Sequence, residues 1–260
     1  MSATVPKFNL PQPTSENIFH LFPDVQPLDV SANKALASAT RTGDPPPSQD
    51  ALMEEMCIVV DEEDREIGMA SKRVCHQLAN IDRGLLHRAF SVLLFDTQNR
   101  LLIHQRASHK ITLPNQWTNT CCSHPLAVAT ETGGIAGSRR AAQRKLQHEL
   151  GVTPDDVALA SLHFATRMHY RCLSDARWGE HEIASVFLCK ADVRLDVNAE
   201  EIRDYRYVTR SELQRMLGDS QFTFTPWFRL YCENFLDGWW EAICADPLPD
   251  LKADCTIHRL

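Results

Sequence analysis

The chain has 260 residues and a formal net charge of −7, so it can form one large globular domain, and its acidic balance argues against nucleic acid or an anionic membrane as the main partner. Its nine cysteines follow no disulfide-scaffold spacing, which favours a reducing compartment. Charges interrupt every apolar run before it reaches the roughly 20 residues that cross a bilayer. We therefore expect a soluble, cytoplasmic protein that binds no nucleic acid and does not insert into membranes.

Residues 1–50 differ in composition from the rest of the chain. They are rich in Pro, Ser, Thr and Ala and include the triplet Pro45–Pro47, a composition that predicts a flexible extension. Arg41 is their sole arginine and several acids are present, so we predict no transit peptide. We expect the folded domain over residues 51–260. The role of the extension is open, and Pro23–Val30 is a candidate lid.

The elements of the domain follow from its apolar patterns. Asp61–Asp64 and Asp96–Asn99 carry turn residues. Ser138–Leu150 has apolar residues at four-residue steps and is followed by Gly151, so it predicts a helix. A second helix is expected over Pro226–Ile243, because Pro suits a first turn and the segment is broadly apolar. Mixed strands and helices indicate an α/β or α+β fold. Strands are predicted at Met56–Val60, Phe90–Phe95, Leu101–His104, Phe164–His169, Ile183–Lys190 and Tyr205–Val208.

The segment Trp117–Pro125 combines a thiol and an imidazole. It reads Trp-Thr-Asn-Thr-Cys-Cys-Ser-His-Pro, with Cys122 two residues before His124. In an extended stretch both side chains share one face. A thiol that moves a proton beside a metal-binding histidine indicates catalysis, although two buried residues of a core strand would show the same pattern. Cys121 alternates to the opposite face and is assigned to packing.

A pair of carboxylates has the same spacing further along the chain. Glu180 and Glu182 lie in Trp-Gly-Glu-His-Glu-Ile, next to a mainly apolar strand, while His181 between them points away. Solvated acids on an exposed strand are the alternative explanation. Two carboxylates on one face of a covered strand repel each other unless a cation lies between them. His76 and His87 are candidate partners upstream, and three imidazoles with two carboxylates suit a divalent ion.

Together these segments resemble the type I isopentenyl-diphosphate delta-isomerases, a branch of the Nudix superfamily. The resemblance runs from about Met56 to Trp240, and the shared motifs occur in the order of the family: Leu-Leu-His-Arg-Ala-Phe-Ser, Trp-Thr-Asn-Thr-Cys-Cys-Ser-His-Pro, Arg-Arg-Ala-Ala-Gln-Arg-Lys-Leu, Trp-Gly-Glu-His-Glu and Thr-Pro-Trp-Phe. It implies the Nudix fold, a mixed sheet sandwiched between helices. It also implies isomerisation of isopentenyl to dimethylallyl diphosphate through a tertiary carbocation, in isoprenoid and sterol synthesis.

The resemblance includes a departure from the hydrolytic Nudix signature. The superfamily helix normally ends in Arg-Glu-x-x-Glu-Glu-x-Gly, whereas Arg144–Gly151 reads Arg-Lys-Leu-Gln-His-Glu-Leu-Gly. Lys145 and His148 replace two metal-binding acids and leave Glu149. This disfavours the first alternative function, a Nudix diphosphohydrolase. The second alternative is a non-catalytic, metal-stabilised binding protein.

The resemblance also implies a role for each site residue. Cys122 and Glu182 would transfer the protons, in an order that the sequence leaves open, while Tyr170 would orient or relay a proton and Trp227 would face the carbocation. The substrate's diphosphate would bind Lys72, Arg106 and Lys110, with Ser123 nearby. One Mg²⁺, or Mn²⁺ or Zn²⁺ in its place, would be held by His76, His87, His124, Glu180 and Glu182. A second Mg²⁺ would bridge Glu149 to phosphate oxygens.

The remaining expectations concern assembly and location. We expect a monomer whose partner is the small isoprenyl diphosphate substrate, although no pattern in the chain defines the oligomeric state. The terminal His258–Leu260 loosely resembles the Ser-Lys-Leu peroxisomal address but lacks its small first residue. The cytoplasm is therefore preferred over the peroxisome.

Overall fold

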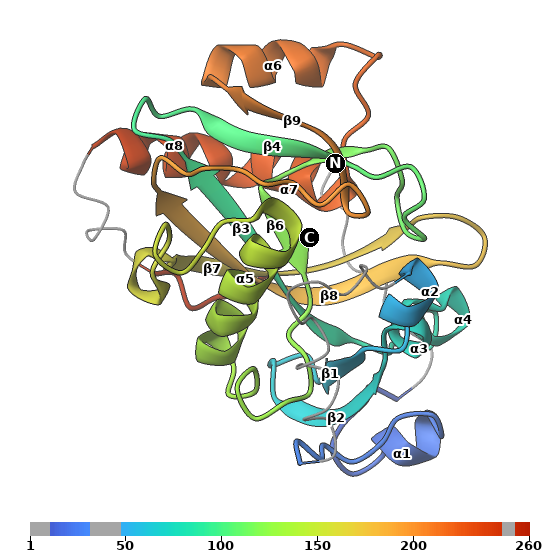
Figure 1. Ribbon diagram of the computed structural model, residues 1–260. Helices are drawn as coiled ribbons and strands as arrows, with labels where there is room; N and C mark the ends of the chain where they lie inside the picture. Colours follow the sequence, from blue (N-terminus) through green and yellow to red (C-terminus); the bar gives the residue numbers. More distant parts are fainter. Residues whose placement is uncertain (1–10, 32–47, 246–252) are drawn as a thin grey trace.

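The structure is a computed structural model that describes residues 11–31, 48–245 and 253–260 (Figure 1). The helices within these residues are α1 (Ile18–Leu21), α2 (Gln49–Leu52), α3 (Lys72–His76), α4 (Leu78–Ile81), α5 (Ile135–Leu150), α6 (Arg210–Gly218), α7 (Pro226–Asn234) and α8 (Leu236–Cys244), with a 3-10 turn at Leu159–Ser161. The strands are β1 (Met56–Val60), β2 (Glu66–Ser71), β3 (His87–Phe95), β4 (Leu101–Arg106), β5 (Trp117–Thr118), β6 (Cys121–Ser123), β7 (His163–Leu173), β8 (Gly179–Lys190), β9 (Ile202–Val208) and β10 (Ile257–Arg259).

These strands belong to one mixed sheet. Its main path is β10-β7-β8-β3-β1-β2, and β4 pairs with β3, β5 and β9. Strands β3 and β8 run parallel, with His87 beside Glu182, and β7 runs antiparallel to β8, with Tyr170 on the other side of Glu182. Strand β6 pairs with β3 so that Cys122 lies opposite Ser91. The register therefore brings residues from four strands to one region of the sheet.

Helices cover both faces of this sheet. Strand β3 is buried along its whole length, as expected for a strand that is covered on both sides. Its alternate residues Leu93 and Phe95 belong to the core formed with α7 and α8, whereas Val92 and Leu94 belong to the core formed with α5. Figure 1 shows α5 and the α7–α8 pair on opposite sides of the sheet. The predicted sandwich of a mixed sheet between helices is confirmed.

The structure differs from the predicted elements in two places near the site. The single helix predicted over Pro226–Ile243 is wrong, because Phe235 leaves the helical conformation at φ −135° and separates α7 from α8. The Phe235 ring stacks on Trp239 with the ring centroids 5.1 Å apart. Strand β8 begins at Gly179 rather than Ile183, so both glutamates of the pair lie on the strand itself.

The described part of the N-terminal extension packs against β2. Ile18, Phe22 and Val25 are buried, and the backbone N–H groups of Gln26 and Met69 each donate to the other residue's carbonyl at 2.8 Å. Residues 11–31 are therefore packed, which their proline content did not predict. Residues 1–10 and 32–47 lie outside the described residues, and the domain boundary at residue 50 stays a prediction.

The C-terminal segment also joins the sheet. Strand β10 runs parallel to β7, with Ile257 beside Arg167 and Arg259 beside His169, and the Leu260 N–H donates to the His169 carbonyl at 3.0 Å. None of the helices in the described residues is both long enough and apolar enough to span a bilayer.

Candidate active site

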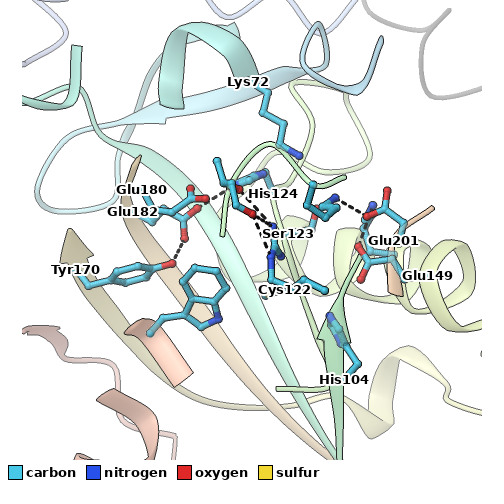
Figure 2. A pocket seen from close by; sticks show the side chains of 15 residues that line it. Lys72, His104, Cys122, Ser123, His124, Glu149, Tyr170, Glu180, Glu182 and Glu201 are labelled. Carbon is cyan, nitrogen blue, oxygen red and sulfur yellow. Dashed lines mark hydrogen bonds and ion pairs between the residues drawn. The ribbon is translucent and has the colours of Figure 1, made fainter. Parts of the chain in front are cut away.

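A pocket lies over the sheet region where β3, β6 and β8 meet, and residues from α3, α5, α7 and the loop after β4 complete its walls (Figure 2). Figure 2 shows Tyr170 with Glu182 on one side, Glu149 with Glu201 on the other, and Cys122 between them. The four residues predicted to be catalytic and the four predicted to bind the diphosphate all line this pocket. The fold thus brings together residues that are spread over most of the chain.

Five potential ligand residues gather at one end of the pocket, which we call the metal end. Their ligand atoms all lie within 4.8 Å of one another, and all five residues are buried. The ring centroids of the three histidines are 4.7 to 4.9 Å apart. Helix α3 supplies one histidine, β3 the second, the segment after β6 the third, and β8 both carboxylates. The residues are His76, His87, His124, Glu180 and Glu182.

The hydrogen bonds of His76 show that this cluster fits a cation. Its Nδ1 donates to the Lys72 carbonyl at 2.6 Å, which leaves a lone pair on Nε2 in the neutral ring. That Nε2 lies 2.7 Å from Oε2 of Glu180, and neither atom has a hydrogen-bond partner in the described residues. Two lone pairs face each other at this distance only when a proton or a metal ion lies between them.

Electrostatics supports the same conclusion. Burial, together with the neighbouring histidines, holds the pKa of His124 well below its usual value, and burial lowers the pKa of His87. Burial alone would raise the pKa of Glu182, but hydrogen bonds from His87 and Tyr170 outweigh it and the pKa is lowered. Neutral imidazoles beside ionised carboxylates are the donor set that binds a divalent cation.

The groups that could move protons lie next to the metal end. The Tyr170 hydroxyl donates to Oε2 of Glu182 at 2.5 Å. Burial raises the pKa of Cys122 to about 12, so its thiol carries a proton at neutral pH. The Trp227 indole is fixed by Nε1, which donates to Oγ1 of Thr118 at 2.9 Å. The pocket therefore offers a protonated thiol, a carboxylate with a phenol, and an aromatic wall.

The other end of the pocket, which we call the diphosphate end because three of its cations are predicted to bind the diphosphate, is a network of opposite charges. The ammonium of Lys145 lies 3.0 Å from Glu149, and that of Lys110 lies 2.6 Å from Glu201. The Arg106 guanidinium donates to the carbonyls of Thr112 and Leu113 while it lines the pocket. Lys72 and Ser123 line the pocket as well.

Reasoning from the sequence missed several residues of this end. Lys145 was recognised as a replacement for an acid of the Nudix signature but was not named as a site residue. Its position in the signature could have indicated that it lines the pocket. His104 and Glu201 also line the pocket, but they occur in no motif that marks them. Long-range pairing of β4 and β9 places the segments of these two residues side by side.

The two neighbours that were assigned away from the site do lie elsewhere. Cys121 belongs to the core under α5, and its thiol contacts Oε2 of Glu149 at 3.5 Å. His181 bonds through Nδ1 to the Leu85 carbonyl at 2.8 Å and through Nε2 to His169 at 2.9 Å. Neither side chain lines the pocket.

Comparisons with known proteins agree with this geometry. Residues 85–228 match the family described as NUDIX domain. The chain is 50% identical over 246 residues to the isopentenyl-diphosphate delta-isomerase IDI1 of Gibberella zeae, covering 93% of each chain. It is 44% identical over 281 residues to the isopentenyl-diphosphate delta-isomerase idi1 of Aspergillus fumigatus, covering 100% of this chain and 98% of that one. The isopentenyl-diphosphate delta-isomerase of Schizosaccharomyces pombe is 50% identical over 213 residues, or 80% of this chain and 92% of that one.

Proposed function

This chain belongs to the isopentenyl-diphosphate delta-isomerases and carries a NUDIX domain, and on that premise we propose which of its residues perform each part of the reaction. The enzyme converts isopentenyl diphosphate to dimethylallyl diphosphate, a step of isoprenoid biosynthesis. The observation that carries the proposal is that Cys122 and Glu182 line one pocket, with the Tyr170 hydroxyl bonded to the carboxylate.

Cys122 and Glu182 transfer the two protons. Moving the double bond requires a proton to be added to one carbon of the alkene and another to be removed from a neighbouring carbon. The raised pKa of Cys122 supports a thiol that holds a proton at neutral pH. The hydrogen bond from Tyr170 to Glu182 supports a carboxylate held in a fixed orientation, with the phenol able to orient or relay its proton.

Trp227 stabilises the positive charge that develops on the substrate. A tertiary carbocation is captured by water unless its site is dry and its walls offer diffuse negative potential, as the face of an indole does. Trp227 lines the pocket, is buried, and its ring centroid lies 6.1 Å from that of Tyr170. We infer that the hydrocarbon part of the substrate lies against this indole.

The metal end binds one Mg²⁺ through the five residues described above, although its donors would also accept Mn²⁺ or Zn²⁺. The bound cation would fix the carboxyl group of Glu182 and stabilise its charge. At the other end, Lys72, Arg106 and Lys110 hold the diphosphate, with Ser123 nearby. Glu149 would hold a second Mg²⁺ at this end.

Hydrolysis of a diphosphate is not favoured. The ammonium of Lys145 lies 3.0 Å from Glu149, so a cation of the protein stands beside the remaining acid of the Nudix helix, where a hydrolase would gather several carboxylates. The nine cysteines are free, which supports a reducing compartment such as the cytoplasm. We further propose that the enzyme acts as a monomer, which light scattering tests.

The experiment is turnover of isopentenyl diphosphate with magnesium in heavy water, following the allylic product, its deuterium content and released phosphate. We expect deuterated dimethylallyl diphosphate, and we expect Cys122→Ala to lower kcat by about 10²- to 10⁴-fold. Cys189→Ala is the control, because this buried thiol of β8 packs in the core with α5 and does not line the pocket. Phosphate release without isomerisation would mean a hydrolase, and a Cys122→Ala enzyme with normal kcat would remove the thiol from the mechanism.

A further inference from the structure

We propose that Glu201 is a positioning residue for the diphosphate of the substrate, which acts by holding the ammonium of Lys110 in the pocket. The inference rests on the proposed role of Lys110 in binding that diphosphate. Glu201 belongs to none of the motifs of the chain, and it lies just before β9, on the opposite side of the pocket from the metal end (Figure 2). A carboxylate in a site for an anion repels the ligand, so its presence requires an explanation.

The contact between the two side chains is short and enclosed. Oε2 of Glu201 accepts a hydrogen bond from Nζ of Lys110 at 2.6 Å, and the side chains are 4% and 9% exposed. Charge-assisted hydrogen bonds of this length are about twice as strong as neutral ones. The flexible stem of a lysine otherwise samples many rotamers. The contact therefore selects the orientation in which the ammonium lines the pocket.

The backbone around Glu201 holds the same loop. The Ala107 N–H donates to the Glu201 carbonyl at 3.0 Å, and Nε2 of His109 bonds to the Glu200 carbonyl at 3.0 Å. The loop that carries Lys110 is thus fixed at its start and middle by the two residues that precede β9. Glu201 contributes to this through its main chain and, independently, through its side chain, so a side-chain substitution leaves the backbone anchor in place.

The second oxygen of Glu201 distinguishes it from an ordinary structural acid. Its Oε1 is buried and has no hydrogen-bond partner among the residues that the structure describes. A buried acceptor that serves only the fold usually has a partner, since an unpaired one costs free energy. Because Glu201 lines the pocket, the unpaired oxygen indicates that this carboxylate serves the pocket rather than the fold.

The charge of Lys110 depends on this carboxylate. Burial lowers the pKa of Lys110 to about 8, Glu201 opposes that shift, and the cations Lys72, Arg106 and Lys145 lower the pKa further. Glu149 is the other acid that faces this group. Without the charge of Glu201, the ammonium would lose its proton at a lower pH. Binding of an anion that needs this ammonium would then weaken at a correspondingly lower pH.

The test measures binding of magnesium pyrophosphate by isothermal titration calorimetry across neutral and alkaline pH. We expect Glu201→Gln to weaken binding by about tenfold near pH 8 and to move the alkaline loss of affinity to lower pH by about one unit. In turnover we expect a raised KM for isopentenyl diphosphate with kcat within about twofold. Glu201→Asp, which keeps the charge, is the second variant if Glu201→Gln does not fold, and it should retain the alkaline limb of the wild type.

The matched control is Glu200→Gln, because Glu200 is the preceding residue, pairs with His109 of the same loop at 2.9 Å and is exposed. It should bind pyrophosphate as the wild type does.

A double variant tests whether Glu201 acts through Lys110. Lys110→Met should lose at least as much affinity for pyrophosphate as Glu201→Gln, and combining the two substitutions should cause no further loss, since both act through one ammonium. Additive losses, or an unchanged pH profile in Glu201→Gln, would overturn the inference. Absence of isomerase activity in the wild type would instead overturn the proposed function, because the binding measurement needs no turnover.

Discussion

The two ends of the pocket differ in how their charged groups are paired. At the metal end, Glu180 and Glu182 form no ion pair with lysine or arginine in the described part of the chain, and their close partners are three histidines and the Tyr170 hydroxyl. At the diphosphate end, Lys110 and Lys145 each lie against a carboxylate. The first end offers a set of ligand atoms that fits a cation from solution, whereas the second supplies cations and holds them with acids of its own.

The elements that build the two ends differ as well. Adjacent strands β3 and β8 hold most of the metal end, and their register places His87 directly beside Glu182. The diphosphate end depends on a loop, on α5 and on the residue before β9, joined by side-chain contacts such as the one between Lys110 and Glu201. We therefore expect the metal end to respond to loss of its cation as a unit, and the diphosphate end to respond to single substitutions by graded losses of affinity.

Removal of the metal should have the largest effect and should separate the two ends. Chelation leaves Glu180 and Glu182 close together and buried without a cation, so we expect turnover to be lost and the melting temperature to fall by several degrees. An ion at 100 times its dissociation constant contributes about 2.7 kcal/mol of stability. Scanning calorimetry with and without chelator, with metal content measured in parallel, gives the shift.

Scanning calorimetry of two variants, with and without chelator, tests whether the stabilising ion binds at the metal end. Glu180→Gln should reduce the metal-dependent shift in melting temperature, because it removes a ligand atom of the cluster. Lys110→Met should keep the full shift, since its ammonium belongs to the other end. An equal shift in wild type and Glu180→Gln would mean that the stabilising ion does not bind at the metal end.

Substitution of Trp227, the aromatic wall between the two ends, should lower turnover but not affinity for the diphosphate. Trp227→Phe removes the indole and its hydrogen bonds to Thr118 and Asn119. We expect kcat to fall by about tenfold, because phenylalanine keeps an aromatic face but offers a weaker negative potential than an indole, with magnesium pyrophosphate bound as in the wild type. The control is Trp239→Phe, because Trp239 stacks on Phe235 in α8 and does not line the pocket. A weaker pyrophosphate affinity in Trp227→Phe alone would place the indole at the diphosphate end.

Much of the metal end was predictable because its signals are local. Spacing of two residues in a strand places side chains on one face, and Cys122 with His124, like Glu180 with Glu182, does line one pocket. The apolar run after Glu182 indicated a covered strand, and β8 is buried almost throughout. The approach of His76 from α3 has no local signal: the sequence marks this histidine only as a candidate partner upstream, and the resemblance implies its role as a ligand.

The diphosphate end was less predictable because its contacts are long-range. Lys110 and Glu201 are 91 positions apart, and no local pattern indicates that the two segments meet. The extension shows a different limit. Ile18, Phe22 and Val25 have helical spacing, but their burial depends on β2, which the sequence analysis did not predict. The proline content of residues 1–50 predicted a flexible extension, whereas residues 11–31 pack against the domain.

Substitution of Gly68 should have the smallest effect on turnover, and this effect should reach both ends of the pocket. A Cβ at this position of β2 would lie 2.7 Å from Cγ1 of Val25 and 3.0 Å from the Gln26 carbonyl, so the N-terminal segment must shift to admit it. Helix α3 follows β2 directly and carries both Lys72 and His76. We expect Gly68→Ala to lower the free energy of unfolding by about 1 to 3 kcal/mol, and to change kcat and KM each by a few-fold.

Gly238→Ala is the control for that substitution. Apart from its chain neighbours and its own helix backbone, no atom of the described residues lies within 4 Å of a Cβ placed at Gly238 in α8. Alanine there should raise the free energy of unfolding by up to about 1 kcal/mol and leave both kinetic constants unchanged. Urea unfolding and steady-state kinetics measure both effects. If Gly68→Ala lowers stability without changing kcat or KM, the N-terminal segment supports the fold but does not position α3, and the two ends are joined only through the sheet. If both constants change together, α3 couples the metal end to the diphosphate end, because this five-residue helix carries both His76 and Lys72.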